Sequence, residues 1–369
     1  MNRIPTLSFF VHTILALVVI ISFSNCKKSK GNPAPKQIRY AGATFLSEEK
    51  AGLAAAAWGN KIMFAGGRST VNGSTNYKKT VDIYDVNSKT WSTAQLSAAR
   101  YEMAAAVGGN KMIFAGGWSS GDINVVDIYD PGTNTWTVSE LSVARRSMAA
   151  AAKGNKIFFG GGVAGQTLFQ TTVDIYDAGS NTWSTAQLSK GRANLGAAAA
   201  GNKIVFGGGT GFTNNATDIF AQVDIYDIST NTWSTAQLSE KRNGLAAAAA
   251  GNKILFAGGG FSNTYTKIVD IYDVSTNSWS TAQLSEARQG LCAVTLGDKI
   301  LFAGGYGANG YSKTVDIYDA TTNTWTVSEL SEAKNGMAGA AIGNTILIGG
   351  GSTASIWRSE ERRVGKECR

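Results

Sequence analysis

Apolar and polar residues alternate over short stretches along most of the chain, without a helical period. The segment 241–284 shows the pattern clearly. A run of small apolar residues, Leu245–Ala250, is followed by Gly251-Asn252 and by a second mainly apolar run, Lys253–Ala257. Three glycines, Gly258–Gly260, come next. Glycine and asparagine readily adopt the positive φ angles of a tight hairpin turn. The pattern therefore predicts two antiparallel strands joined by a short turn.

Two more strands follow in the same segment. After a loop of variable length the chain reads Val269-Asp-Ile-Tyr-Asp, then a polar turn at Ser275–Asn277, then Ser278–Leu284, which contains Trp279. Small polar residues such as these favour turns. Four short strands within about 46 residues are typical of one blade of a β-propeller.

The block Val-Asp-Ile-Tyr-Asp, followed after five residues by Trp, occurs six times, at intervals of 45, 47, 50, 46 and 46 residues. Such a period indicates a repeated supersecondary unit. The tyrosines and tryptophans of these blocks are Tyr84, Trp91, Tyr129, Trp136, Tyr176, Trp183, Tyr226, Trp233, Tyr272, Trp279, Tyr318 and Trp325. A glycine pair precedes each block, and a seventh pair follows the last one: Gly66-Gly67, Gly116-Gly117, Gly161-Gly162, Gly208-Gly209, Gly258-Gly259, Gly304-Gly305 and Gly350-Gly351.

The order of glycine pair, tyrosine in the third strand and tryptophan in the fourth resembles the kelch family, over about Tyr40–Trp357. Thr353–Trp357 aligns with Thr-Val-Asp-Ile-Tyr, and Gln37–Leu46 can supply a missing fourth strand. We therefore expect an all-β, seven-bladed kelch-type β-propeller with four-stranded antiparallel blades. We expect N- and C-terminal strands to share one blade and so close the ring, which would leave no free sheet edge.

Side-chain size indicates how the strands of a blade are ordered. Ala54–Ala57, Ala149–Ala152 and Ala246–Ala250 carry only small side chains. Blades converge on the axis of a propeller, so we expect these strands to be innermost. The tryptophans are expected on the outer strands, where the blades diverge and more volume must be filled.

The two ends of the chain differ from the repeats. Residues 1–25 resemble a lipoprotein signal peptide, because an apolar run from Leu7 to Ile21 leads to Phe23-Ser-Asn-Cys26, and Cys26 would then carry the lipid. An ordinary secretory signal with an incidental cysteine is the alternative. Residues 26–36 are interpreted as a tether, 37–357 as the propeller, and 358–369 as a non-native tail that resembles a translated sequencing adaptor.

Charge and rare residues exclude several function classes. The formal charge is +8, but residues 1–39 contribute +6 and residues 358–369 contribute +2, which leaves 40–357 neutral. A neutral body gives no electrostatic basis for nucleic-acid binding. The only histidine, His12, lies in the expected signal, so a Ser-His-Asp triad and a histidine metal site lack an essential group. Cys292 is the single cysteine of the repeats, which excludes a disulfide framework. We expect no cofactor and no metal ion.

A positive residue recurs in each connection between blades: Lys50, Arg100, Arg145, Arg192, Arg242, Arg288 and Lys334. A ring of cations could bind an anionic ligand. The alternative, which we favour, is that each cation locks neighbouring blades together, because a residue present in every unit serves what every unit needs.

The loops between the second and third strands vary, and they carry aromatic residues that include Trp118, Phe212, Phe261, Tyr306 and Tyr311. Aromatic side chains on variable loops over a rigid scaffold are candidate ligand contacts. Equally, they could fold back onto the blades. The paired acids of each block, such as Asp82 and Asp85, recur at one spacing six times, which favours turn and strand roles over catalysis.

Two functional hypotheses follow. The first is a monomeric, non-enzymatic binding module, held at the bacterial cell envelope by lipid on Cys26, that presents its loops to an unknown protein or glycan. The membrane is contacted only through the lipid. The second is a carbohydrate enzyme, because this chain is similar in repeat pattern to bacterial kelch propellers of the sialic-acid epimerase (mutarotase) type. It would need an asymmetric cluster on one face, for example around Glu102 and Arg146, which depart from their repeat equivalents.

Overall fold

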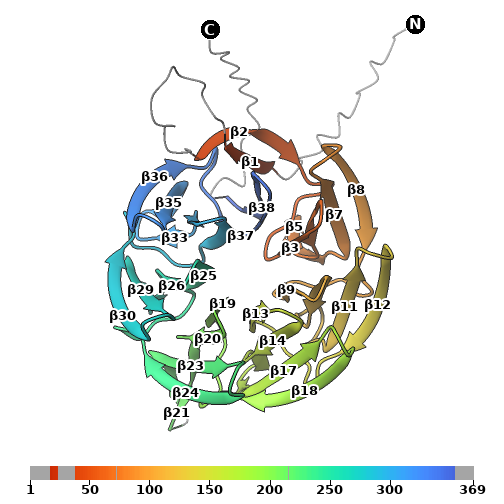
Figure 1. Cartoon of the computed structure of the whole chain (residues 1–369). Helices are drawn as coiled ribbons and strands as arrows, with labels where there is room; N and C mark the ends of the chain where they lie inside the picture. The colour runs from red at the N-terminus through yellow and green to blue at the C-terminus, as the bar shows by residue number, and fades with distance from the viewer. Residues whose placement is uncertain (1–16, 24–37, 72, 215, 354–369) are drawn as a thin grey trace, which may run out of the picture.

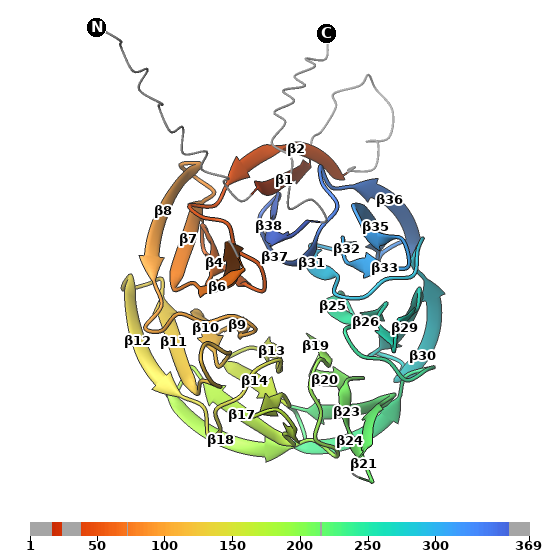
Figure 2. The same ribbon diagram turned by 180° about the vertical axis from the view of Figure 1, so that it is seen from behind.

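The computed structural model describes residues 17–23, 38–71, 73–214 and 216–353. Their strands form six four-stranded antiparallel blades that follow the repeat, one further four-stranded sheet of mixed origin, and five two-stranded hairpins. The four-stranded sheets are arranged in a ring around a common axis (Figure 1), and the view from behind shows the same ring (Figure 2). The all-β fold and the four-stranded antiparallel blades are as predicted.

Each of the six blades is built from one continuous stretch of chain. In order from the axis outward, their strands are β3 (Ala54–Trp58), β4 (Lys61–Ala65), β7 (Thr80–Asp85) and β8 (Thr90–Gln95) in the first blade; β9 (Ala104–Gly108), β10 (Lys111–Ala115), β11 (Val125–Asp130) and β12 (Thr135–Glu140) in the second; β13 (Ala149–Lys153), β14 (Lys156–Gly160), β17 (Thr172–Asp177) and β18 (Thr182–Gln187) in the third; β19 (Gly196–Ala200), β20 (Lys203–Gly207), β23 (Gln222–Asp227) and β24 (Thr232–Gln237) in the fourth; β25 (Ala246–Ala250), β26 (Lys253–Ala257), β29 (Ile268–Asp273) and β30 (Ser278–Gln283) in the fifth; β31 (Cys292–Leu296), β32 (Lys299–Ala303), β35 (Thr314–Asp319) and β36 (Thr324–Glu329) in the sixth.

The predicted order of strands within a blade is confirmed. The alanine-rich strands β3, β13 and β25 lie nearest the axis, where neighbouring innermost strands approach one another, and the tryptophan-bearing strands lie on the outside (Figure 1). Side chains of adjacent blades fill the space between them. Between the first and second blades, for example, Met63 and Ile83 pack with Phe114 and Tyr129 in one buried cluster.

The tyrosine and tryptophan of each block pack together on the outer half of the blade. The rings of Tyr129 and Trp136 lie 5.0 Å apart, and the Tyr129 hydroxyl donates a hydrogen bond to Asn134 Oδ1 at 2.6 Å. Asn134 has φ +56° and turns the chain between the third and fourth strands. Asparagine tolerates this conformation better than most residues, so the turn and the aromatic pair are explained together.

The prediction of a seven-bladed propeller is wrong, because only six blades are built on the repeat. The seventh unit, at the C-terminus, contributes only two strands, β37 (Asn335–Ile342) and β38 (Thr345–Ser352). They join β1 (Leu17–Phe23) and β2 (Ile38–Phe45) in the order β2-β1-β38-β37, which we call the closing sheet. The molecule is therefore a propeller of six repeat blades with a composite sheet at the seam. Seven glycine pairs overcounted the blades, because the last pair is not followed by a complete block.

The strands of the closing sheet bear on two sequence expectations. β2 is the outer strand of this sheet, the place expected for Gln37–Leu46. The third position was expected for the segment that begins at Thr353, but β1 takes it. Residues 17–23, which form β1, belong to the expected signal peptide. Cys26 and residues 354–357 lie outside the described residues, so the signal, tether and tail remain expectations.

Candidate functional site

The hairpins all project from the face on which the second strand of a blade connects to the third, here called the hairpin face. They are β5–β6 (Arg68–Val71, Ser74–Tyr77), β15–β16 (Val163–Ala164, Leu168–Phe169), β21–β22 (Thr210–Thr213, Ala216–Ile219), β27–β28 (Gly260–Phe261, Thr264–Tyr265) and β33–β34 (Tyr306–Gly307, Gly310–Tyr311). The strands of the blades are nearly identical, whereas these hairpins differ in length and sequence. The hairpin face is consequently where the repeats differ from one another.

Aromatic side chains of neighbouring hairpins contact each other across the face. Phe212 meets Phe169 edge to face at 5.1 Å, and Tyr306 meets Tyr265 at 5.8 Å; within its own hairpin, Tyr306 also meets Tyr311 at 5.4 Å. The predicted ligand contacts Phe212, Phe261 and Tyr306 nevertheless remain 41%, 47% and 36% exposed, and Tyr311 is half-buried. These rings therefore pack on one another and still present surface, and ligand contact by them stays a prediction.

The second blade has no hairpin. Only eight residues separate Gly117 from Val126, fewer than in the other five loops. Instead, Trp118 forms isolated bridges with Tyr101 and with Asp122. Around this short loop lie Tyr101, Glu102, Trp118, Asp122 and Arg146, here called the second-blade cluster.

Arg146 is the centre of the second-blade cluster. Its Nη1 lies 2.6 Å from Asp122 Oδ1 and donates to the Gly165 carbonyl at 3.0 Å, and its guanidinium carbon lies 4.5 Å from the centre of the Trp118 ring. Nε is 3.7 Å from Glu102 Oε2. The Arg146 side chain is 19% exposed, so a partly buried cation connects the second-blade loop with the third blade.

Glu102 belongs to a circle of backbone hydrogen bonds around the axis. The residue two places after each blade-connection cation has positive φ. In the first six units its N–H donates to the carbonyl of the equivalent residue in the preceding unit, with Gly52 N–H bonded to the Gly336 carbonyl of the last unit. These residues are Gly52, Glu102, Ser147, Asn194, Gly244, Gly290 and Gly336. Only three adjacent members, Glu102, Ser147 and Asn194, are not glycine. Of these, Ser147 donates a hydrogen bond from Oγ to Glu102 Oε2 at 2.9 Å. The circle is therefore polar on one side and bare glycine on the other.

Tyr101 extends the second-blade cluster toward the first blade. The Arg68 guanidinium carbon lies 4.4 Å from the centre of its ring, and Tyr77 stacks on it at 5.7 Å. Burial, with the neighbouring Glu102 carboxylate, raises the pKa of Tyr101, and Arg68 partly offsets that effect. The phenol is therefore a neutral hydrogen-bonding group near pH 7.

The structure places the predicted ring of cations inside the protein. Arg100, Arg145, Arg192 and Arg288 are 0% exposed, Lys50 and Arg242 are 1% exposed, and Lys334 is 8% exposed. Six of them pair with the first aspartate of a block: Lys50–Asp82, Arg100–Asp127, Arg145–Asp174, Arg192–Asp224, Arg242–Asp270 and Arg288–Asp316. Burial lowers the pKa of Arg100, and Asp127 partly restores it. Groups held in this way are positioned to tie blades together, which is the alternative that the sequence favoured.

The second aspartate of each block has a local role in the turn. Asp85 Oδ1 accepts hydrogen bonds from the backbone N–H of Asn87 and Ser88, at 2.9 and 3.0 Å. These bonds lower the pKa of Asp85. The two acids of a block therefore have separate partners and do not form a catalytic pair.

Three further observations limit the chemistry. Within the described residues, no group of three or more histidine, cysteine or acidic side chains could hold a metal ion. Burial raises the pKa of the Cys292 thiol to about 12, so it is not a reactive thiolate at neutral pH. In the described part of the chain, no helix has the length and apolar character required to cross a membrane.

Three members of the second-blade cluster, Glu102, Arg146 and Trp118, are predicted from the sequence, and the structure brings them together. Asp122 and Tyr101 are not predicted, nor is Arg68, which packs on Tyr101. The shortness of the loop after Gly117 could have indicated Asp122, because an acidic residue in so short a loop must lie close to the blade connections. The remaining aromatic candidates lie on other hairpins.

Comparison with known proteins agrees with this architecture. The family model of the KLHDC2/KLHL20/DRC7 Kelch-repeats domain matches residues 52–243 and 140–287, and that of the Kelch motif matches residues 287–328. The solved structure of YjhT is similar, with a TM-score of 0.59 and 16% sequence identity over 77% of this chain and 98% of that one. At this identity the likeness shows the fold alone. No curated protein matches the sequence.

Proposed function

The chain belongs to the Kelch-repeat family, and on that premise we propose that it is a non-enzymatic binding module whose hairpin face engages a protein or glycan. One observation carries this proposal. The six blades repeat the same strands, ion pairs and turns, while the exposed aromatic residues Phe212, Phe261 and Tyr306 lie on hairpins that differ between blades. A rigid frame with variable, partly exposed aromatic loops is a common basis for recognition.

The proposal is tested by screening the folded full-length chain on a glycan array, with calcium present and absent, and in parallel by affinity capture from envelope extracts. Trp118→Ala and Tyr306→Ala serve as hairpin-face variants, and Val138→Ala on the outer strand β12 serves as the control. We expect a specific ligand in one of the two screens that the hairpin-face variants lose and the control keeps. A ligand that all three variants retain would refute binding at this face.

We further propose that the protein is held at the bacterial cell envelope by lipid on Cys26. The support is the sequence Phe23-Ser-Asn-Cys26 at the end of an apolar run. Replacement of Cys26 by alanine is expected to release the protein from the membrane fraction. Equal membrane association of the wild type and the Cys26→Ala variant would contradict the proposal.

A second candidate function is turnover of a sugar, and the second-blade cluster favours it. Glu102 and Arg146 approach to 3.7 Å, and Asp122 supplies a second carboxylate on the same guanidinium. Two carboxylates in unlike surroundings are what general acid and base chemistry requires. Here the Glu102 side chain is 37% exposed and that of Asp122 only 9%.

The enzyme hypothesis predicts that Glu102→Gln abolishes anomer interconversion of a sialic acid, measured by NMR, without lowering Tm. Asn194→Ala is the matched control, because Asn194 occupies the same circle of hydrogen bonds two blades away. Absence of any interconversion by the wild type would leave the binding module as the function.

A further inference from the structure

Six connections between units contain the same carboxylate-binding arrangement. In each, the first aspartate of a block accepts a hydrogen bond from the backbone N–H of the serine that begins the preceding connection, at 2.8–3.1 Å, and pairs with the cation three residues later. Ser47 and Lys50 around Asp82 are one example, with Lys50 Nζ 2.6 Å from Asp82 Oδ2. We call such a serine N–H and cation a socket.

A seventh socket lies in the connection that leads into the closing sheet. Leu330, Ser331 and Lys334 repeat the spacing of Leu46, Ser47 and Lys50. Lys334 is buried as its equivalents are, but slightly less completely, at 8% exposure against 0–1%. Among the described residues, however, no aspartate reaches either Ser331 N or Lys334 Nζ. Lys334 Nζ instead pairs at 3.0 Å with Glu332, whose side chain is 52% exposed.

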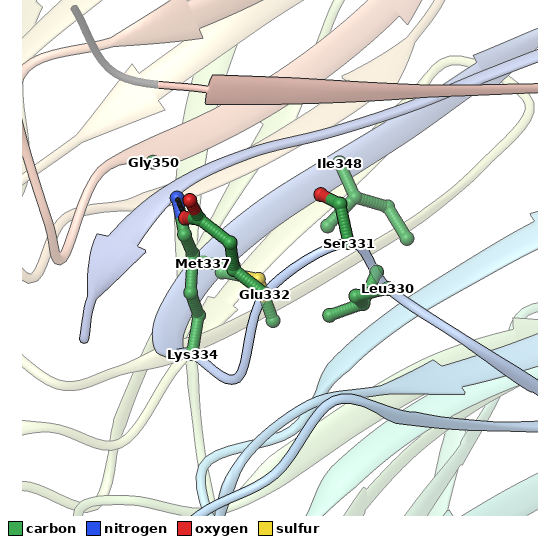
Figure 3. A pocket seen from close by; sticks show the side chains of 7 residues that line it. All are labelled: Leu330, Ser331, Glu332, Lys334, Met337, Ile348 and Gly350. Atoms are coloured by element: carbon green, nitrogen blue, oxygen red, sulfur yellow. Dashed lines mark ion pairs between the residues drawn. The ribbon is translucent and has the colours of Figure 1, made fainter. Parts of the chain in front are cut away.

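A small cavity adjoins this seventh socket. It is lined by Leu330, Ser331, Glu332, Lys334, Met337, Ile348 and Gly350, and Figure 3 shows the Lys334 and Glu332 side chains meeting at its edge. The Lys50 socket also has a lysine as its cation, and there the buried Asp82 carboxylate neutralises the ammonium charge. Uncompensated burial of an ammonium group is unfavourable, so a buried carboxylate should bind Lys334 more favourably than a half-exposed one.

The register of the closing sheet identifies the position from which a carboxylate would arrive. Asp82 of β7 lies opposite Phe64 of β4, and Asp316 of β35 lies opposite Phe302 of β32. In the closing sheet, Val19 of β1 lies opposite Ile348 of β38. The third strand of this sheet therefore has valine at the position where all six blades have aspartate.

We propose that the seventh socket is a carboxylate-binding site for a strand, of the Val-Asp-Ile-Tyr-Asp type, that another polypeptide inserts between β38 and β2. The carboxylate would accept hydrogen bonds from Ser331 N–H and Lys334 Nζ, as in the six sockets. Backbone pairing to the two neighbouring strands would supply the rest of the affinity. The third strand position of the closing sheet is open once β1 has left it. From the sequence we expect residues 1–25, which include β1, to be cleaved off as a signal peptide.

The socket itself is tested in the full chain with Val19→Asp, compared with Val19→Asn. The register predicts that only the aspartate reaches Lys334, so Tm should rise by about 2 °C or more over the asparagine variant. The rise should disappear when Lys334→Met is added to both. An equal Tm for the two variants, or a rise that persists without Lys334, would overturn the proposal.

The inserted strand is tested with a fluorescent peptide that copies Lys313–Ala320. Ile20→Pro in the full chain prevents β1 from pairing fully, because proline removes a ladder hydrogen bond. The folded Ile20→Pro chain should bind the peptide at least tenfold more tightly than its D316N version, by fluorescence anisotropy, and Lys334→Met should remove the difference. Equal binding of both peptides, or none, would overturn the proposal. If Ile20→Pro fails to fold, the Val19 variants decide the question alone.

Discussion

Arg100 Nη2 lies 2.6 Å from Asp127 Oδ2, and both side chains are almost completely buried at the junction of the first and second blades. Asp127 Oδ1 also accepts a hydrogen bond from Ser97 N–H at 2.9 Å. One carboxylate therefore holds two points of the connection that arrives from the preceding blade. This arrangement recurs six times, so it is a regular polar link between neighbouring units.

We expect Arg100→Met to lower the free energy of unfolding by about 3–5 kcal/mol, because it leaves the Asp127 charge buried and uncompensated. Lys241→Met is the control, since it breaks the exposed pair with Asp218, and should cost about 0–1 kcal/mol. Urea unfolding followed by tryptophan fluorescence measures both. Similar values for the two variants would show that the buried pair does not link the blades.

The glycine pairs provide a second test of how the units are joined. A Cβ at Gly66 would lie 2.5 Å from the Arg100 carbonyl oxygen, whereas a Cβ at Gly251 would meet nothing within 4 Å. Both glycines have positive φ, +61° at Gly66 and +56° at Gly251. Gly251→Ala should therefore cost only the backbone term of about 1–2 kcal/mol.

Gly66→Ala should cost clearly more than Gly251→Ala, because the added methyl group displaces the next blade connection. Thermal unfolding monitored by circular dichroism compares the two. If both variants lose the same stability, close packing at the glycine pair is not what requires glycine there.

The turn aspartates predict how the protein responds to acid. Hydrogen bonds from Ser275 lower the pKa of Asp273 to about 2, and the pKa values of Asp85, Asp130, Asp227 and Asp319 are also lowered. A carboxyl group whose pKa is lower in the folded state stabilises the fold above its unfolded pKa, and this contribution is lost as the pH falls through the folded value. Tm should therefore be constant from pH 7 to about 5 and fall between pH 4 and 2. The Asp273→Asn variant should show a shallower fall, and an identical profile would contradict this assignment.

The second-blade cluster predicts a local effect. Arg146 joins Asp122, Gly165 and Trp118 across two blades, so Arg146→Met should increase amide hydrogen exchange in residues 118–124 and 163–169. Exchange in the second-blade strands β10 and β11 should stay unchanged. Increased exchange throughout the blade would show that Arg146 supports the blade and not only the loops.

The sequence predicted the repeated parts of the fold well, because six copies of one pattern report the same local physics. Strand order, the inner alanines, the outer tryptophans and the turn role of Asp85 all follow from a single unit. The seam was predicted less well, because residues that occur only once carry no such repetition. Nothing in Leu17–Phe23 indicated that it would take the third position beside β38, since its apolar run equally suits a signal peptide.

The candidate site divides in the same way. Glu102 and Arg146 were identifiable because they interrupt a repeat, whereas Tyr101 and Asp122 acquire their importance only from contacts made across two blades. The burial of the seven cations was also not determined by sequence, because a positive residue in a connection can face water or a carboxylate. Their pairing with the first aspartate of each block required the three-dimensional register.

The central claim, that ligands bind at the hairpin face, is tested most directly by photo-crosslinking in the cell envelope. A benzophenone amino acid replaces Phe212, Phe261 or Tyr306 on the hairpins, or Val138 or Val327 on the outer strands, where both valines are similarly exposed. We predict specific adducts from the hairpin positions and none from the valine positions. Adducts formed only from Val138 and Val327 would contradict the claim and place the binding surface on the outer wall of the propeller.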